Sequence, residues 1–276
     1  MKRVILSLFV SILFSLTCAA QSDTSSVSVA ENPTSEASEN ISPVSMKDRV
    51  IEAYNNGQYE RVIELLEKEK GEHLTNKEES ADLYYNLGNA YFRDNEIAKA
   101  LLYYEKALLL KPGDKDIRHN IEYANTKIED KIAVTDTFFL SSWFQGAQNL
   151  MASNSWAWFA VVCFILFIAC LFMFFFTKTR LSKQIAFYTG IVLIILIIFS
   201  NVFSYRQKSH VENRNSAIIM AASVPVRSSP DFNSKEVFLL HSGTKVLVTK
   251  EDRDWCEIEI ADGNVGWIEK NKLEII

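Results

Sequence analysis

The sequence predicts a multidomain α + β membrane protein that combines a short all-α array, two transmembrane helices and a C-terminal all-β barrel. Three observations support this fold class. Residues 81–114 carry small and aromatic side chains at helical spacing and are closed by a proline. Two uncharged apolar runs of about twenty residues each follow, at 155–177 and 184–204. Residues 216–276 then alternate short apolar runs with glycine, proline and aspartate, as strands and turns do.

The N-terminal residues have the layout of a secretory signal peptide. Lys2 and Arg3 precede an apolar core of about a dozen residues, and small residues follow that core. We predict a signal peptide over residues 1–20, with cleavage after Ala20. The alternative is a lipoprotein signal that uses Cys18, which Thr17 disfavours because a smaller residue is preferred before the lipidated cysteine.

Residues 21–45 differ in composition from the rest of the chain. They are rich in serine, threonine, glutamate, asparagine and proline, and they contain hardly any large apolar side chain. Such a segment cannot bury enough surface to offset its chain entropy, so we predict a disordered linker that acts as a spacer.

The segment 81–114 has the pattern of one helix–turn–helix repeat. Its regularly spaced positions hold Tyr84, Leu87, Gly88, Tyr91, Ala100, Tyr104, Ala107 and Pro112. This pattern resembles a tetratricopeptide repeat of about 34 residues at every signature position, with tyrosine in place of the usual tryptophan and phenylalanine. The small residues let two antiparallel helices approach closely, and the proline ends the second helix. The resemblance implies an all-α repeat unit here.

A single repeat cannot bury its own apolar face, so neighbouring repeats are required. Upstream, "AYNNGQYERVIELLEK" fits a degenerate copy in which Gly57 is the counterpart of Asn95. Downstream, "KDIRHNIEYANTKIEDK" places apolar residues at helical spacing and resembles a capping helix. We therefore predict a tetratricopeptide array over residues 46–131 with about five helices.

Arrays of this kind bind peptides or proteins on the concave face lined by the first helix of each pair. In the best repeat this face carries Asp82, Tyr85, Asn86, Asn89, Phe92 and Arg93. The two asparagines resemble those with which some members of the family hold a peptide backbone or a terminal carboxylate. The alternative is a plain protein-docking surface, because "NLGNAY" also serves as a packing motif.

An amphipathic segment is predicted over residues 136–153. Phe139, Trp143, Ala147 and Leu150 share one helical face, and polar residues lie elsewhere. An aromatic helix next to a membrane span suits the membrane interface. The alternative is a helix that packs under the repeat array.

The two apolar runs predict transmembrane helices at 155–177 and 184–204. The loop between them, "TKTRLSK", is basic and favours a cytoplasmic position, whereas Arg206, Lys208 and Arg214 beyond the second run favour the opposite orientation. The predicted signal peptide decides between them, since it sends the chain before the first span across the membrane. The array and, after two crossings, the C-terminal segment are then both expected outside the cytoplasm.

The C-terminal segment contains "VPVRSSP", "HSGTKV", "DWCEIEI" and "DGNVGWI", in that order. These words resemble a bacterial Src-homology-3-like (SH3b) domain, which implies a small β-barrel over residues 216–276. Inward positions are expected at Val226, Val246, Ile258 and Trp267, with Gly266 relieving crowding beside the tryptophan.

Members of the SH3b class often bind cell-wall peptides or short extended ligands. The residues that would contact such a ligand here are Arg227, Asp231, Trp255 and Trp267. Trp255 follows the charged turn "KEDRD" and is a candidate for a partly exposed platform. The alternative is that Trp255 only stabilises the barrel.

The sequence contains no motif for catalysis, for a cofactor or for a metal site. The four histidines lack metal-ligand spacing, and neither a phosphate loop nor a nucleophile elbow is present. The net charge of −5 without a basic cluster outside the membrane flanks argues against nucleic-acid binding. A thiol oxidoreductase would depend on Cys256 alone, and the sequence shows nothing that would activate this thiol.

The order of these parts is similar to that of the BatE-type members of the Bacteroides aerotolerance protein family. The resemblance implies an inner-membrane complex with von Willebrand-type partner proteins, linked to envelope integrity and oxidative-stress tolerance. It provides no catalytic residues. We therefore expect a non-catalytic inner-membrane scaffold that presents two periplasmic binding modules. The alternative is a cell-wall sensor or anchor that binds peptidoglycan peptides through the SH3b domain.

Overall fold

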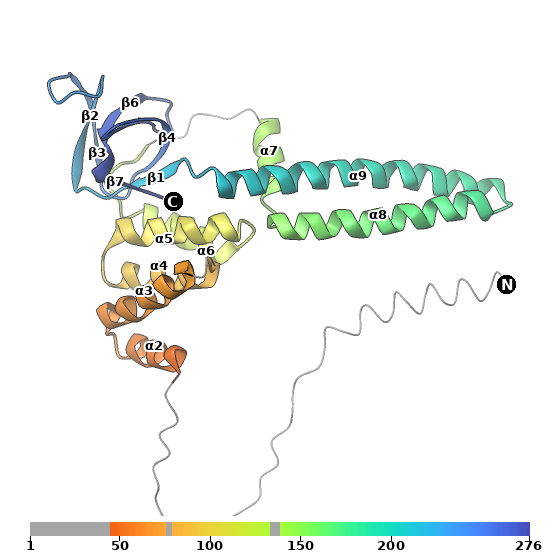
Figure 1. Cartoon of the computed structure of the whole chain (residues 1–276), viewed down its shortest axis with the longest axis horizontal. Helices are drawn as coiled ribbons and strands as arrows, with labels where there is room; N and C mark the ends of the chain where they lie inside the picture. The colour runs from red at the N-terminus through yellow and green to blue at the C-terminus, as the bar shows by residue number, and fades with distance from the viewer. Residues whose placement is uncertain (1–44, 76–78, 133–138) are drawn as a thin grey trace, which may run out of the picture. The chain divides into compact units, whose positions relative to one another are not determined.

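The computed structural model describes residues 45–75, 79–132 and 139–276 (Figure 1). The predicted signal peptide, and the predicted linker up to residue 44, lie outside the described residues. The side chains of Leu74, of residues 139–142 and of Gln145 lie outside them as well, and Phe139 of the predicted amphipathic face is among these.

The repeat array consists of α2 (Met46–Asn55), α3 (Tyr59–Thr75), α4 (Ala81–Arg93), α5 (Ile97–Leu110) and α6 (Lys115–Asn125). Its five helices stack one after another in Figure 1, as the repeat pattern predicts. The chain leaves α2 and α4 through equivalent turns, in which Gly57 (φ 70°) and Asn95 (φ 65°) adopt left-handed backbone conformations. The upstream segment therefore shares the turn geometry of the best repeat.

Local sequence explains where the helices of the array begin. The Ser80 side chain accepts a hydrogen bond from the backbone N–H of Leu83 and caps α4. The Asp114 carboxylate does the same for α6 through the N–H groups of Asp116 and Ile117. The starts of α4 and α6 thus follow from their capping residues, whereas Ser45 before α2 and Glu96 before α5 make no such side-chain hydrogen bond.

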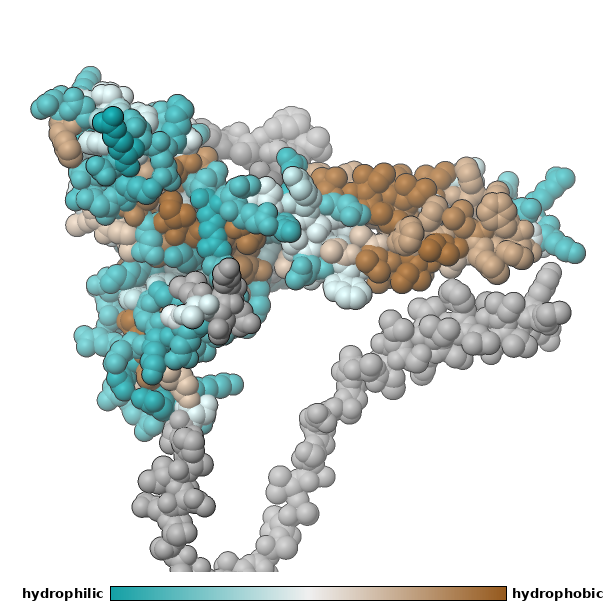
Figure 2. All heavy atoms as spheres, in the orientation of Figure 1, coloured by the Kyte–Doolittle hydropathy of each residue, from teal (hydrophilic) through white to brown (hydrophobic). Residues whose placement is uncertain are grey.

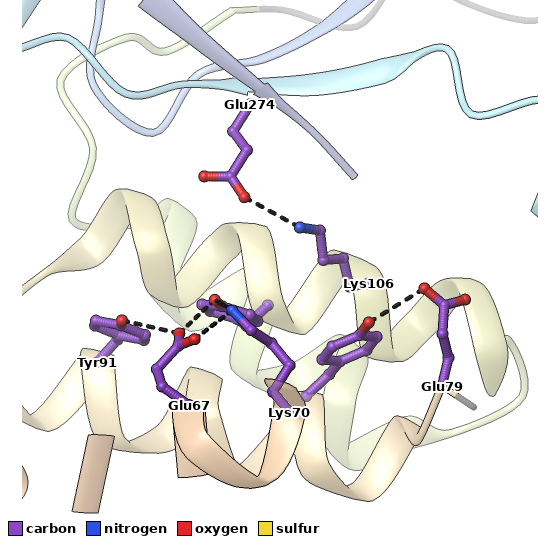
Figure 3. A network of polar contacts seen from close by, with 8 residues as sticks. Glu67, Lys70, Glu79, Tyr91, Lys106 and Glu274 are labelled. Atoms are coloured by element: carbon purple, nitrogen blue, oxygen red, sulfur yellow. Dashed lines mark hydrogen bonds and ion pairs between the residues drawn. The ribbon is translucent and has the colours of Figure 1, made fainter. Parts of the chain in front are cut away.

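A partly buried polar network joins the degenerate repeat to the best one (Figure 3). Oε1 of Glu67 on α3 accepts hydrogen bonds from the hydroxyls of Tyr91 (3.1 Å) and Tyr103 (2.5 Å), and Lys70 donates to the Tyr103 hydroxyl (2.7 Å). Burial alone would raise the pKa of Glu67, but the hydrogen bonds from Lys70 and Tyr103 outweigh it and lower that pKa. The carboxylate therefore stays charged and ties α3 to α4 and α5.

The apolar runs form two antiparallel helices, α8 (Ser153–Phe176) and α9 (Arg180–Glu212). Both are long and apolar enough to cross a membrane, and Figure 2 shows the hydrophobic surface along them. Ser200 on α9 donates to the carbonyl of Trp156, and the hydroxyls of Ser153 and Ser204 lie 3.2 Å apart. These partly buried polar contacts join α8 to α9 at the end where α8 begins, and side-chain hydrogen bonds of this kind contribute to the association of apolar helices.

The helix boundaries differ from the predicted spans at the second helix. The prediction ends it at residue 204, but α9 continues to Glu212, and only residues 177–179 separate it from α8. The polar residues after 204 remain helical because this part of α9 packs on other elements. Gln207 is buried and lies 3.4 Å from Gln148 on α7 (Phe139–Gln148).

The C-terminal segment folds into an antiparallel sheet of β1 (Ser216–Ile219), β2 (Ser223–Arg227), β3 (Glu236–His241), β4 (Lys245–Asp252), β5 (Trp255–Glu259), β6 (Val265–Glu269) and β7 (Leu273–Ile275), with the short 3₁₀ helix η1 (Lys270–Lys272) before β7. The strand order is β3-β2-β6-β5-β4-β1-β7. The prediction of an all-β SH3b-type domain is confirmed, but the sheet does not close into a barrel.

The inward side of the sheet corrects the expectation for Trp267. Val226, Val246 and Ile258 are buried as predicted. In β6, however, Gly266 and Ile268 are the buried residues, so strand alternation places Trp267 on the opposite, partly exposed side. A Cβ at Gly266 would lie 3.0 Å from the carbonyl oxygen of Arg227 and would overlap Val226. The glycine therefore makes room for β2 and not for Trp267.

The sheet packs directly against the array, which the sequence did not predict. Ile218 on β1 and Ile276 belong to the same apolar core as the array residues. Lys245 pairs with Glu105 on α5 at 2.7 Å, and Lys106 pairs with Glu274 at 3.2 Å (Figure 3). We call this contact between α5, residues 126–132 and the sheet the array–sheet junction.

Asp130 caps the junction with three interactions. Its Oδ2 accepts hydrogen bonds from the backbone N–H of His241 (2.7 Å) and from the hydroxyl of Thr244 (2.6 Å). Its Oδ1 lies 2.7 Å from Nδ1 of the His241 ring. The carboxylate thus holds the turn between β3 and β4 against the end of the array.

Candidate functional site

The first candidate site is the predicted face of α4, where the structure places Asp82, Tyr85, Asn86, Asn89, Phe92 and Arg93. The spacing of these residues along one helix brings them to one side of it. We call this surface the α4 face. Its side chains differ in the hydrogen bonds and ion pairs that they make with other residues of the protein.

Asn89 is the most constrained side chain of the α4 face. Its Oδ1 accepts a hydrogen bond from the Tyr104 hydroxyl (2.8 Å) and another from Nδ2 of Asn120 (3.1 Å). Asn120 also donates to the hydroxyl of Tyr85 at 3.1 Å. Because two donors fix the amide oxygen, the Nδ2 group of Asn89 is the part that can donate to a ligand.

The two charged residues of the α4 face have different surroundings. Arg93 is exposed, and its hydrogen bond with Tyr54 on α2 raises the pKa of its guanidinium. Asp82 pairs with Lys111 at 2.6 Å, so its charge is already balanced. Arg93 therefore offers a permanent cation beside Asn89, whereas Asp82 mainly ties α4 to the end of α5.

Three residues that the sequence analysis did not select complete this surface. Tyr54 lies on α2, while Asn120 and Tyr123 lie on α6, and the Tyr123 ring is 5.5 Å from that of Phe92. The repeat period would have indicated two of them, because Asn120 and Tyr123 follow Asn86 and Asn89 by about 34 residues each. The surface thus extends over the first helices of successive repeats.

The second candidate site is the outer side of the sheet. Strand pairing places Arg227 opposite Trp267, and Trp267 opposite Glu257, so these three side chains form a row across β2, β6 and β5. Arg227 also donates to the carbonyl of Ser234 at 2.8 Å. Both charges are already paired within the sheet, Arg227 with Glu236 at 3.2 Å and Glu257 with Lys250 at 2.9 Å, so the Trp267 ring is the part of this row that is left to contact a peptide.

Trp255 is not the exposed platform that the sequence suggested. Its side chain is 8% exposed, and the ring of Phe232, which is 63% exposed, packs on it edge to face with centroids 5.0 Å apart. Asp231 accepts a hydrogen bond from the N–H of Asn233 and shapes the same loop. The accessible aromatic surface at this end of the sheet therefore belongs to Phe232, with Trp255 as its support.

A pocket of about 190 Å³ lies where α5, α9 and β4 meet. Its lining includes His210 and the charged residues Glu105, Arg214 and Lys245. Lys245 pairs with Glu105, and Arg214 pairs with Glu79. These pairings tie the array to the sheet and to the end of the second apolar helix.

The described residues contain no group of three or more histidine, cysteine, aspartate or glutamate side chains placed to hold a metal ion. Cys256 is fully buried in the sheet, and burial is the main cause that raises the pKa of its thiol. A buried thiol with a raised pKa is a poor nucleophile at neutral pH.

Comparison with known proteins supports both domain types. Residues 81–114 match the family "Tetratricopeptide repeat", and residues 222–274 match the family "Bacterial SH3 domain". The chain is also 30% identical over 77 residues to "Putative N-acetylmuramoyl-L-alanine amidase YrvJ" of Bacillus subtilis (strain 168). This match covers 28% of the chain and 15% of the length of that relative. The fold and these matches define a protein with two apolar helices and two domains of kinds that bind proteins, peptides or peptidoglycan.

Proposed function

We propose that the protein is a non-catalytic inner-membrane scaffold that presents two periplasmic binding surfaces to other proteins of an envelope complex. The observation that carries this proposal is the array–sheet junction, which holds both surfaces in one body next to the two apolar helices. The resemblance to the aerotolerance family supports von Willebrand-type membrane proteins as partners and oxidative-stress tolerance as the process.

The chemistry of the α4 face favours an extended peptide segment with a carboxylate. The Nδ2 group of Asn89 donates a hydrogen bond, Arg93 supplies a permanent positive charge, and the rings of Phe92 and Tyr123 supply apolar contact. Hydrogen bonds between charged groups are stronger than neutral ones and favour a carboxylate over a neutral ligand atom. A short array buries little area, so attachment to the same membrane as the partner would raise the effective affinity.

Changing Asn89 and Arg93 tests this surface. Asn89→Asp keeps the oxygen that Tyr104 and Asn120 contact but replaces the donor, and Arg93→Gln removes the charge. The double variant is expected to capture a membrane-embedded partner about 10- to 100-fold more weakly, as judged by pull-down from solubilised membranes. Arg61→Gln, an exposed residue of α3, is the matched control. Equal capture by all three proteins would contradict a binding role for the α4 face.

The alternative function is a cell-wall sensor or anchor that binds peptidoglycan peptides. Two observations favour it. The first is the row of Arg227, Trp267 and Glu257 on the outer side of the sheet, and the second is the similarity to "Putative N-acetylmuramoyl-L-alanine amidase YrvJ". In this case the SH3b domain would recognise the wall and the array would relay to a partner.

Variants of Phe232 and Trp255 separate recognition from stability at this surface. Phe232→Ala is expected to lower the binding of purified peptidoglycan in a pelleting assay while the melting temperature falls only slightly, because the mostly exposed ring loses one edge-to-face contact with Trp255. Trp255→Ala removes a buried ring and is expected to destabilise the sheet by about 3–5 kcal/mol. Leu239→Ala, an exposed position on β3, serves as the control. Unchanged pelleting of the Phe232 variant would argue against wall recognition at this end of the sheet.

The proposed topology places both binding surfaces in the periplasm. An alkaline phosphatase reporter fused after Ile276 is expected to be active, and a reporter inserted between α8 and α9 after Lys178 is expected to be inactive, because phosphatase folds only outside the cytoplasm. The reverse pattern would show that the short basic loop lies in the periplasm and the SH3b domain in the cytoplasm.

A further inference from the structure

The segment between the array and the first apolar helix carries large apolar side chains that the rest of the protein leaves uncovered. Trp143 on α7 is 70% exposed, and Leu150, just after α7, is 68% exposed. Met151 is also exposed. We call Trp143, Leu150 and Met151 the α7 surface. Exposed side chains of this size in one short segment indicate a surface that contacts something else.

Other side chains of α7 fix it to the end of the second apolar helix. The Phe144 ring packs edge to face on Phe203 of α9, with centroids 4.9 Å apart, and the Arg206 guanidinium lies over the Phe144 ring. The indole N–H of Trp156 donates to the carbonyl of Gln148 at 3.0 Å. The position of α7 relative to both apolar helices is therefore set by contacts, and its exposed residues are those that these contacts leave free.

These contacts lie along α9 at the level that the head-group layer would have if the apolar run spanned the hydrocarbon core of a bilayer. Phe203 lies at the end of the apolar run, and Gln207, which contacts α7, lies one helical turn further, a rise of about 6 Å. The head-group layer adds about 5–8 Å to each side of the hydrocarbon core. A helix attached at this height reaches the layer in which tryptophan side chains are enriched in membrane proteins.

The same segment also contacts the array. Nη2 of Arg118 on α6 donates to the carbonyl of Asn149 at 3.4 Å, and a Cβ at Gly113 would overlap the carbonyl of Leu150. The turn after α7 thus connects the array to the level at which the apolar helices end.

We propose that the α7 surface lies in the head-group layer of the bilayer and holds the array close to the membrane. The ligand of this surface is the boundary between lipid head groups and acyl chains. The sequence of α7, "FLSSWFQGAQ", contains no charged residue, so burial of Trp143, Leu150 and Met151 supplies the attraction and salt does not weaken it. This inference rests on the proposed membrane insertion of α8 and α9.

Fluorescence quenching by brominated lipids tests the inference on the full chain. The protein is reconstituted into phosphatidylcholine vesicles with bromine near the carbonyl end of the acyl chains. Three variants, Trp143→Phe, Trp158→Phe and Trp267→Phe, are compared with the unchanged protein, so that each difference reports one tryptophan. Trp158 on α8 is the membrane reference, and Trp267 on the sheet is the reference outside the membrane.

The quenchable fluorescence is expected to fall in Trp143→Phe and in Trp158→Phe, and to stay constant in Trp267→Phe, in both low and high salt. Loss in Trp158→Phe without loss in Trp143→Phe would overturn the inference while leaving the spans intact. Absence of loss in both variants would overturn the membrane insertion itself. A Trp143 contribution that disappears in high salt would overturn attachment by apolar burial.

Discussion

Replacement of Gly88 by leucine is expected to unfold the array, because α4 and α5 cross at this residue with no room for a side chain. A Cβ at Gly88 would lie 2.6 Å from Cε1 of Tyr104 and closer still to Cδ1. The Tyr104 ring cannot move away easily, since it is buried and its hydroxyl donates to Asn89. Overpacking of this kind costs about 1–3 kcal/mol, and a full leucine side chain at a helix crossing is expected to exceed that range.

Thermal unfolding of the full chain in detergent measures the effect. The full chain is the appropriate sample because Ile218 and Ile276 belong to the core of the array, and an isolated fragment of residues 46–131 would lack them. Gly71→Leu is the matched control: Gly71 lies on α3 with no atom near its missing side chain, so leucine is expected to be neutral or slightly stabilising there. Equal melting temperatures for the two variants would contradict the close crossing of α4 and α5.

Much of the array was predictable because its structure follows from local pattern. The repeat spacing indicated where the two helices pack closely and where the second helix ends. It also aligned Gly57 with Asn95, and both residues have left-handed backbone conformations in the structure. The contact network around Glu67 was not predictable. It depends on two tyrosines that lie 24 and 36 residues further along the chain.

In the sheet, the sequence pattern alone does not determine which residues are buried. In "NVGWIE" both Trp267 and Ile268 are apolar, so alternation alone allowed either of them to face inward. The close approach of Val226 to Gly266 decides which face of β6 is buried, because only a glycine fits beside β2 at this position. Ile268, two residues further on the same face, then enters the core. Similarly, the composition around Trp255 did not reveal that Phe232, from a loop in another part of the segment, covers its ring.

The candidate sites were predictable in part, for the same reason. The residues of the α4 face come from one helix and follow from its spacing. The partners that orient them, Tyr104 and Asn120, come from two other helices, and the engagement of Asp82 by Lys111 depends on the fold. The array–sheet junction was not predictable at all, since Asp130 and His241 are 111 residues apart in the sequence.

Loss of the Asp130 side chain is expected to open the array–sheet junction. Asp130→Ala removes the acceptor of the His241 N–H and of the Thr244 hydroxyl, and Thr244 is buried. A buried donor without its acceptor costs about 1–3 kcal/mol. Glu129→Ala is the matched control, because Glu129 is largely exposed and its oxygen lies 3.6 Å from the same histidine ring. Exposed ion pairs contribute about 0–1 kcal/mol, so this variant should keep the junction closed.

The junction is also expected to depend on pH in a definite direction. Burial alone would raise the pKa of Asp130, but hydrogen bonds from Thr244 and His241 outweigh it and lower that pKa. A carboxyl group with a lowered pKa stabilises the folded state at pH values above its ordinary pKa of about 4. This contribution is lost as the pH falls through the lowered pKa. The hydrogen bond with Asp130 is the largest cause that raises the pKa of His241. The contribution of protonated His241 to the stability of the folded state is complete below about pH 6.5. It is lost as the pH rises through the raised pKa of this histidine.

The junction should therefore be most stable between about pH 4 and pH 6.5 and should weaken on either side. The ion pairs of Lys245 with Glu105 and of Lys106 with Glu274, and the apolar contacts of Ile218 and Ile276, also hold the junction, so the weakening above pH 6.5 is expected to be partial. Hydrogen exchange of the amides between Leu240 and Thr244, corrected for the intrinsic pH dependence of exchange, measures the opening. Asp130→Asn retains a side-chain acceptor but not the charge, and it is expected to make protection lower and independent of pH from 5 to 8. If the variant kept the pH dependence of the unchanged protein, another group would have to be responsible, and Asp130 and His241 would have to be excluded as the pair that controls the junction.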